Sequence, residues 1–198
     1  MSVEDAAPPE DYEKARYASI AAAIGCITAV GIGLSLSVPL LSLEMERMGA
    51  SNTLIGINTA VAGVAAIMVV PFVPKLAARV GVLTLLWLAV GLAALSLIAF
   101  KVVFDIFWWF PIRFLFSIAL GTMFVLSEFW INSAAPPARR GFVMGIYATV
   151  LALGFAAGPA VLALVGTSGW PPYIAGSILC CLAALPLLLA RGISPQIG

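Results

Sequence analysis

Residues 82–103 read VLTLLWLAVGLAALSLIAFKVV, a run of 22 residues in which Lys101 is the single charged side chain. A helix of about 20 residues crosses the roughly 30 Å of hydrocarbon in a bilayer. Because no water is available there to bond the backbone, a run of this kind adopts a helix. The stretch therefore predicts a membrane-spanning helix.

Five further stretches have the same character, so that six predicted spans fill most of the 198 residues. They are Ala18–Leu43, Thr53–Pro74, Val82–Val103, Phe107–Ser133, Gly141–Val165 and Pro171–Ala190. The chain is 63% hydrophobic and 10% charged, with a mean hydropathy of +1.12, whereas soluble domains carry about 25% charged residues. We therefore expect an all-α integral membrane protein with one six-helix transmembrane domain over residues 18–190.

Few residues lie outside these spans. Residues 1–17 are polar and acidic without an apolar pattern, which predicts a disordered cytosolic tail rather than a cleaved signal. Residues 191–198 are expected to form a short cytosolic end. Lys and Arg number seven in segments on the side of the N-terminus and two in the opposite loops. By the positive-inside rule, both termini are expected in the cytoplasm, with the protein in an inner or plasma membrane.

The residue types present argue against catalysis. The sequence contains no histidine, which excludes Ser-His and Cys-His catalysis and the common zinc sites. Its three cysteines, Cys26, Cys180 and Cys181, lie within predicted spans and are interpreted as packing residues. No phosphate-binding G-x-x-x-x-G-K-[ST] pattern occurs. We therefore expect no enzyme, no ATPase, no metal and no bound cofactor.

A faint internal repeat relates the second and fifth spans. The Gly-Ile and Val of residues 56–61 recur 89 positions later in residues 145–150, and a proline follows in each span, at Pro71 and Pro159. An odd number of spans separates the two copies, so the three-helix units containing them would be inverted relative to each other. Nested three-plus-three repeats of this kind are a transporter architecture.

Four elements occur in a specific order along the chain. They are the Pro74–Val82 loop, Arg113 with Gly121 in the fourth span, Arg139–Gly141 before the fifth, and Gly154–Pro159 within the fifth. Over residues 18–190 this set resembles the amino-terminal half of a major facilitator superfamily transporter. The resemblance implies two inverted three-helix repeats and a small-molecule site between two six-helix halves that rock against each other. It also implies a proton gradient as the energy source.

The loop after the second span departs from the family pattern Gly-x-x-x-Asp-Arg-x-Gly-Arg-Arg. Pro74 replaces the first Gly and Ala78 the Asp, while Arg79 and Gly81 remain. In the family, that Asp resembles part of a charge network on the inner side that holds one state of the gate. The cytoplasmic side of this chain is therefore expected to close differently or less firmly.

Glu128 is the one acidic residue within a predicted span, about a turn from the inner end of the fourth. Asn132 lies four residues on and shares its helix face. A carboxylate in low dielectric needs a partner. We hypothesise that Glu128 pairs with Arg140 or Arg79 as an inner gate latch. The alternative makes Glu128 a proton carrier with a raised pKa.

Arg113, several residues into the fourth span, allows two interpretations. It is either a charge facing the central cavity that orients an anionic group or responds to proton binding, or an arginine that snorkels to the outer interface. The R-x-x-x-G pattern with Arg113 resembles the coupling element of the family and favours the first interpretation. Gly121, further along the same helix, belongs with the small packing residues.

The fifth span carries Gly154, Gly158 and Pro159. Glycines four apart allow another backbone to approach closely, and a proline bends a helix by removing a hydrogen bond. The same residues resemble the antiporter pattern of the family, although Leu162 and Ala163 replace its Gly-Gly, and favour efflux over uptake.

Three polar residues are candidates for a substrate cavity: Asn58, Tyr147 and Thr28. The alternative interpretation of each is a hydrogen bond to a carbonyl of its own helix or to a neighbouring helix. With so few charges in the spans, we expect a neutral or amphipathic small molecule as substrate.

The sequence thus predicts a secondary active transporter, working by proton-coupled efflux through alternating access and present as one six-helix half. Its expected partners are the lipid bilayer, the substrate and a second six-helix half from the same or another chain, and no nucleic acid. The alternative is a transport-incompetent membrane scaffold, an accessory subunit or a fragment of a split transporter.

Overall fold

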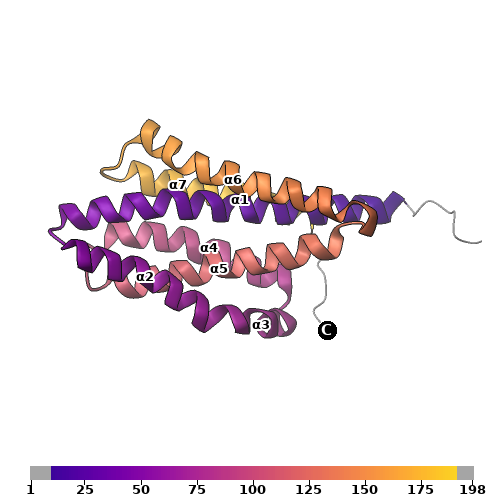
Figure 1. Ribbon diagram of the computed structural model, residues 1–198, viewed down its shortest axis with the longest axis horizontal. Helices are drawn as coiled ribbons and strands as arrows, with labels where there is room; N and C mark the ends of the chain where they lie inside the picture. The colour runs from indigo at the N-terminus through magenta and orange to yellow at the C-terminus, as the bar shows by residue number, and fades with distance from the viewer. Residues whose placement is uncertain (1–9, 191–198) are drawn as a thin grey trace, which may run out of the picture.

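The computed structural model describes residues 10–190, and over this range the chain is a bundle of α-helices joined by short turns (Figure 1). Six helical segments are long and apolar enough to cross a membrane. The all-α fold with six spans is confirmed. The elements are α1 (Glu10–Arg47), α2 (Asn52–Val69), η2 (Val70–Phe72), α3 (Val73–Val80), α4 (Val82–Val102), α5 (Trp109–Ala134), η3 (Pro137–Arg139), α6 (Arg140–Val165), α7 (Pro171–Ala183) and η4 (Leu185–Leu188).

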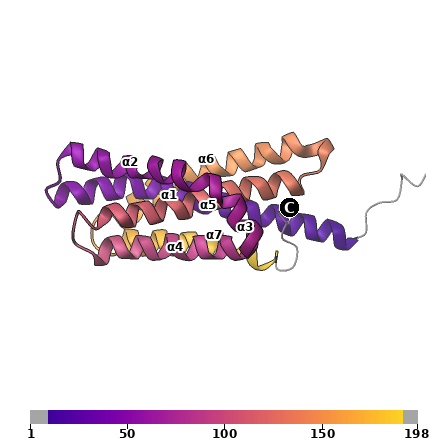
Figure 2. The same cartoon turned by 90° about the horizontal axis from the view of Figure 1, so that it is seen from below.

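The helix α1 runs the length of the bundle and packs against α5, α6 and α7, while α4 packs against α5 and α7 and α2 against α5 (Figures 1 and 2). If the first three spans are exchanged with the last three, α1 takes the place of α5, α2 that of α6, and α4 that of α7. The exchange converts the α1–α6 contact into α5–α2 and the α4–α5 contact into α7–α1, and both products are present. The contacts therefore have the pattern of two three-helix repeats related by a pseudo-two-fold axis.

The two ends of the bundle are named here by the predicted orientation. The outer end carries the α1–α2, α4–α5 and α6–α7 connections, and the inner end carries α3 and the α5–α6 turn. The first and last described residues both lie at the inner end (Figure 1). An even number of spans requires this arrangement.

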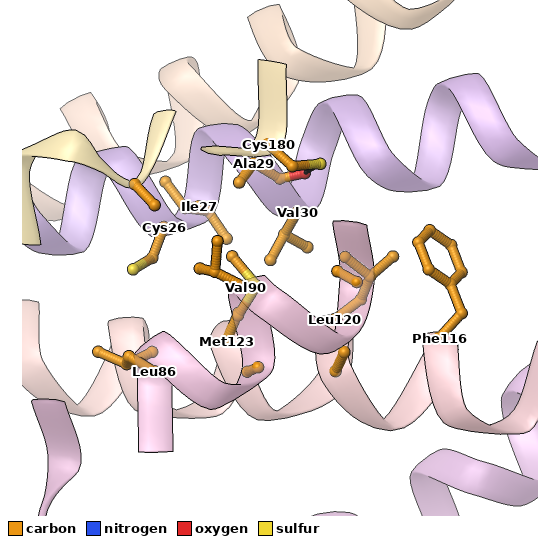
Figure 3. Close-up of a cluster of buried hydrophobic side chains, with 14 of the residues drawn as sticks. Cys26, Ile27, Ala29, Val30, Leu86, Val90, Phe116, Leu120, Met123 and Cys180 are labelled. Carbon is orange, nitrogen blue, oxygen red and sulfur yellow. Dashed lines mark hydrogen bonds between the residues drawn. The ribbon is translucent and has the colours of Figure 1, made fainter. Parts of the chain in front are cut away.

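The core lies where α1 meets α4, α5 and α7 (Figure 3). It is built from small and branched side chains of α1 interleaved with larger ones of the neighbouring helices. Because lipid is as apolar as these side chains, close packing rather than burial from water holds helices together in a bilayer. Buried residues at this junction are Cys26, Ile27, Ala29, Val30, Leu86, Val90, Phe116, Leu120, Met123 and Cys180.

The first helix is longer at both ends than predicted. It begins at Glu10, so residues 10–17 are helical and the prediction of a disordered tail is wrong there; residues 1–9 lie outside the described range. The Arg16 guanidinium lies 3.4 Å from the Glu13 carboxylate, an i,i+3 pair that supports a helix turn. At the other end α1 continues beyond Leu43 to Arg47.

The second span is interrupted at the inner end, where a loop was predicted. The α-helix stops at Val69, the turn η2 contains Pro71, and α3 then covers most of Pro74–Val82. A proline cannot donate the helical hydrogen bond, which accounts for the break at Pro71. In α3, Val73 and Ala77 are buried while the basic residues are exposed, so the segment is an amphipathic helix.

The last span also differs from the prediction. The α-helix of α7 ends at Ala183 and the chain continues as the 3-10 helix η4 over Leu185–Leu188. Pro186 disfavours the α conformation of the residue before it, which ends the regular helix. The short cytosolic end predicted for residues 191–198 lies outside the described range. The remaining span boundaries agree with prediction to within two residues.

Candidate functional site

Arg113 lies one turn into α5, near the outer end of the bundle, and is 3% exposed. Its Nε atom has no hydrogen-bond partner, and no ion pair to Arg113 is formed within residues 10–190. The side chain is therefore enclosed almost completely by the neighbouring helices, and its role in coupling stays a prediction. An unpaired cation at this depth is costly, since charges in membrane spans are normally paired or face a polar pathway.

Asn58 on α2 is the second buried polar residue with an unused donor. It is 1% exposed and its Nδ2 atom has no partner. The helices α2 and α5 are in contact and both begin at the outer end, and a Cβ on Gly121 would lie 3.6 Å from Val70, just beyond the end of α2. Asn58 and Arg113 are therefore unsatisfied donors in the outer half of two packed helices. Sequence reasoning selected both residues but did not relate them.

A charge network at the outer end was missed by sequence reasoning. Glu44, 7% exposed, lies on the extension of α1. Its carboxylate forms ion pairs with Lys101 Nζ at 3.4 Å and with Arg47 Nη1 at 3.0 Å. Arg47 in turn donates to the backbone carbonyl of Thr167 and, at 3.0 Å, to its hydroxyl. The expectation that Glu128 is the one acidic residue within a span is therefore wrong.

The network joins three separated parts of the chain: the end of α1, the end of α4 and the α6–α7 turn. Lys101 also lies 5.9 Å from the ring centre of Tyr173 at the start of α7, within cation–π range. These contacts hold the outer ends of both three-helix units together. The network therefore links α1, α4 and the α6–α7 turn at the outer end.

The crossing of α1 and α6 is built from very small residues. A Cβ on Gly154 would lie 3.1 Å from Gly31 Cα, and one on Gly158 would lie 2.6 Å from the backbone nitrogen of Leu36. Ser35 Oγ donates to the Gly154 carbonyl at 3.1 Å and secures the crossing. The glycines predicted to permit close approach of another backbone thus face α1.

Pro159 follows directly and is exposed within α6, which remains one helix from Arg140 to Val165. The bend expected at Pro159 stays a prediction.

The residues predicted to form the inner gate do not meet in this conformation. Glu128, Arg79 and Arg140 are all exposed, and within the described residues no ion pair joins Glu128 to either arginine. Asn132 does lie on the same turn, but its Nδ2 donates to the backbone carbonyl of Glu128 at 2.9 Å. A latch between these charges requires a rearrangement of the inner end.

Two of the predicted cavity residues bond within the bundle. The Tyr147 hydroxyl is buried and lies 2.9 Å from Ser127 Oγ, which connects α6 to α5. Thr28 Oγ1 donates to the Ile24 carbonyl one turn earlier at 2.7 Å. Of the three candidates, Asn58 alone retains a buried donor without a partner.

A comparison with known protein families agrees with the helix order, the inverted repeats and the glycine crossing. The family model described as Major Facilitator Superfamily matches residues 23–196. The chain belongs to the major facilitator superfamily. As a member of this superfamily it is an integral membrane protein of a transporter family and not an enzyme.

A curated relative extends this result. The chain is 24% identical over 170 residues to a protein of Bacillus subtilis (strain 168) named as an uncharacterised MFS-type transporter, YfkF. The match covers 86% of this chain and 44% of the relative. The chain thus spans less than half the length of that superfamily member.

Proposed function

We propose that the chain is one six-helix half of a proton-coupled transporter that exports small neutral or amphipathic molecules by alternating access. The proposal rests on superfamily membership and on Arg113, whose buried donor has no partner. The match to less than half of a relative's length supports a second half that completes the pathway. Both termini are assigned to the cytoplasm by the excess of Lys and Arg on that side.

Arg113 is proposed as the coupling residue for a physical reason. A carboxylate near a buried guanidinium is stabilised when ionised and loses that attraction when protonated. Proton binding to such a carboxylate would therefore release Arg113 and shift the balance between two conformations. Glu128 cannot be this carboxylate in the present arrangement, because 15 residues of α5 separate the two, roughly 22 Å along the helix. We infer that the partner carboxylate comes from the second half.

The proposal is tested in proteoliposomes that contain the chain with its second half. An imposed proton gradient is expected to drive accumulation of ethidium or chloramphenicol against its concentration difference. Arg113→Gln should abolish the dependence on the gradient, whereas Lys75→Gln, which removes an exposed charge on α3, should leave it intact. Transport by Arg113→Gln with full gradient dependence would contradict the coupling role. Absence of gradient-driven movement of either probe by folded wild-type assembly would contradict the proposed efflux.

A further inference from the structure

A cavity of about 430 Å³ opens at the inner end, between the first turns of α1 and the start of α6. Figure 2 shows the two segments diverging here, so that the α5–α6 turn stands apart from the N-terminal part of α1. Its volume falls in the range of small-molecule sites. The lining combines two arginines, one acidic residue and a group of apolar side chains. The residues used below are Glu13, Arg16, Ile20, Arg139, Phe142 and Ile146.

The charges of this groove favour an anion. Arg139 lies in the turn η3, is exposed, and forms no ion pair within residues 10–190. Arg16 has one ion pair, at 3.4 Å to Glu13, and the Glu13 side chain is 48% exposed. Exposed pairs of this kind contribute at most about 1 kcal/mol. An incoming phosphate can therefore take the place of Glu13 at little cost.

The apolar part of the groove continues along α6 into the membrane. A second hollow of about 350 Å³ shares Phe142 and Ile146 with the first and is otherwise lined by residues up to Val150. The rise from Arg139 to Val150 is roughly 16 Å, close to the thickness of one leaflet of hydrocarbon. Phe142 is 71% exposed and Ile146 is 38% exposed, so a long apolar ligand would cover both.

We propose that this groove binds an anionic phospholipid, with the phosphate at Arg16 and Arg139 and an acyl chain along α6 past Phe142 and Ile146. Basic pockets between membrane helices on the cytoplasmic side are known to hold lipid headgroups. A phosphate attached to a chain of this length satisfies both parts of the groove, whereas a soluble phosphate satisfies the arginines alone. The site is separate from Arg113, at the opposite end of α5.

The test places a photoreactive benzoylphenylalanine at Phe142 in the assembly with its second half, in bilayers of equal phosphatidylglycerol and phosphatidylcholine. The probe at Phe142 should crosslink to phosphatidylglycerol at least about fivefold more than to phosphatidylcholine. The same probe at Phe155, exposed on α6 but outside the groove, should show a ratio near one. A ratio near one at Phe142 would overturn the proposal.

Charge variants locate the headgroup. Arg139→Gln should lower the preference roughly fivefold, as expected for one basic side chain near an anionic headgroup, and Glu13→Gln should raise it. Lys75→Gln, which removes an exposed inner-end charge away from the groove, should have no effect. An equal loss of lipid preference in Lys75→Gln would mean that the preference comes from the overall positive charge of the inner surface, and it would overturn the proposal.

Two further outcomes separate the lipid from other occupants. Ile20→Trp keeps every charge but fills the groove, and it should lower capture at Phe142 while circular dichroism stays unchanged. Competition by soluble glycerol 3-phosphate at the concentration of the lipid would identify a free phosphate compound instead. A preference found in the isolated chain but lost in the assembly with the second half would assign the groove to the interface between halves. Either of these last two results overturns the proposal.

Discussion

The crossing of α1 and α6 gives the sharpest prediction, because Gly158 leaves no room for a side chain. A methyl group there would lie 2.0 Å from Ser35 Oγ, 2.6 Å from Leu36 N and 2.6 Å from Ser35 C. The serine hydroxyl can rotate away, but the two backbone atoms cannot. Since non-bonded heavy atoms prefer roughly 3.5 Å, Gly158→Ala must move the helices apart by nearly 1 Å.

The expected cost follows from three terms. Overpacking a close-packed contact costs about 1–3 kcal/mol. Displacing the hydrogen bond from Ser35 to the Gly154 carbonyl costs about 1 kcal/mol more, whereas alanine gains about 1 kcal/mol over glycine in helix propensity. Gly158→Ala should therefore destabilise the bundle by about 1–3 kcal/mol.

The assay is thermal unfolding of the purified protein in mild detergent, followed by circular dichroism. At about 2–4 °C per kcal/mol for a chain of this size, the Tm of Gly158→Ala should fall by roughly 2–12 °C. Gly145→Ala is the matched control, because it lies on the same helix with nothing within 4 Å of the added Cβ. That variant should keep or slightly raise the Tm. Equal melting of the two variants would refute the close approach of α1 and α6.

Three other predictions are tested by the same thermal unfolding measurement. Glu44→Gln leaves Lys101 without its counter-charge at a largely buried position and should lower the free energy of unfolding by about 2 kcal/mol. A decrease below about 0.5 kcal/mol would show that the charge network does not stabilise the bundle. Arg113→Met removes a buried cation that has no partner, so it should raise the Tm while abolishing coupled transport, and a lowered Tm would reveal a partner for Arg113. Ser127→Ala and Tyr147→Phe, combined in a double-mutant cycle, should show a coupling free energy of about 0.6 kcal/mol, whereas strict additivity would mean that their contact contributes nothing.

The number and order of the spans could be predicted from the sequence because length and apolar content alone decide whether a helix crosses a bilayer. The ends of the helices could not. Glu44 was predicted to lie beyond the first span because it is charged. In the structure its charge is compensated by Lys101, 57 residues later, and a local stretch of sequence cannot reveal that pairing. The break at Pro71 was visible as a proline, but the amphipathic helix α3 after it resembled a loop.

The candidate site could be predicted only in part, because some of its features depend on local sequence and others on contacts between distant helices. The spacing of Gly154 and Gly158 indicated a close helix contact, since that depends on local geometry alone, but only the fold identified α1 as the partner. Arg113 and Asn58 were selected as polar residues in apolar helices. That both keep an unused donor depends on the neighbours of α2 and α5, which no local pattern specifies.

The central claim is that this chain forms half of a transport pathway and works with a second six-helix unit. Native mass spectrometry of the protein isolated from its own membranes in mild detergent tests this most directly. We predict that each 20.6 kDa six-helix unit is accompanied by a second one, either in the same polypeptide or as a separate subunit. A lone 20.6 kDa chain, folded and without a second six-helix unit, would contradict the account and favour the scaffold alternative.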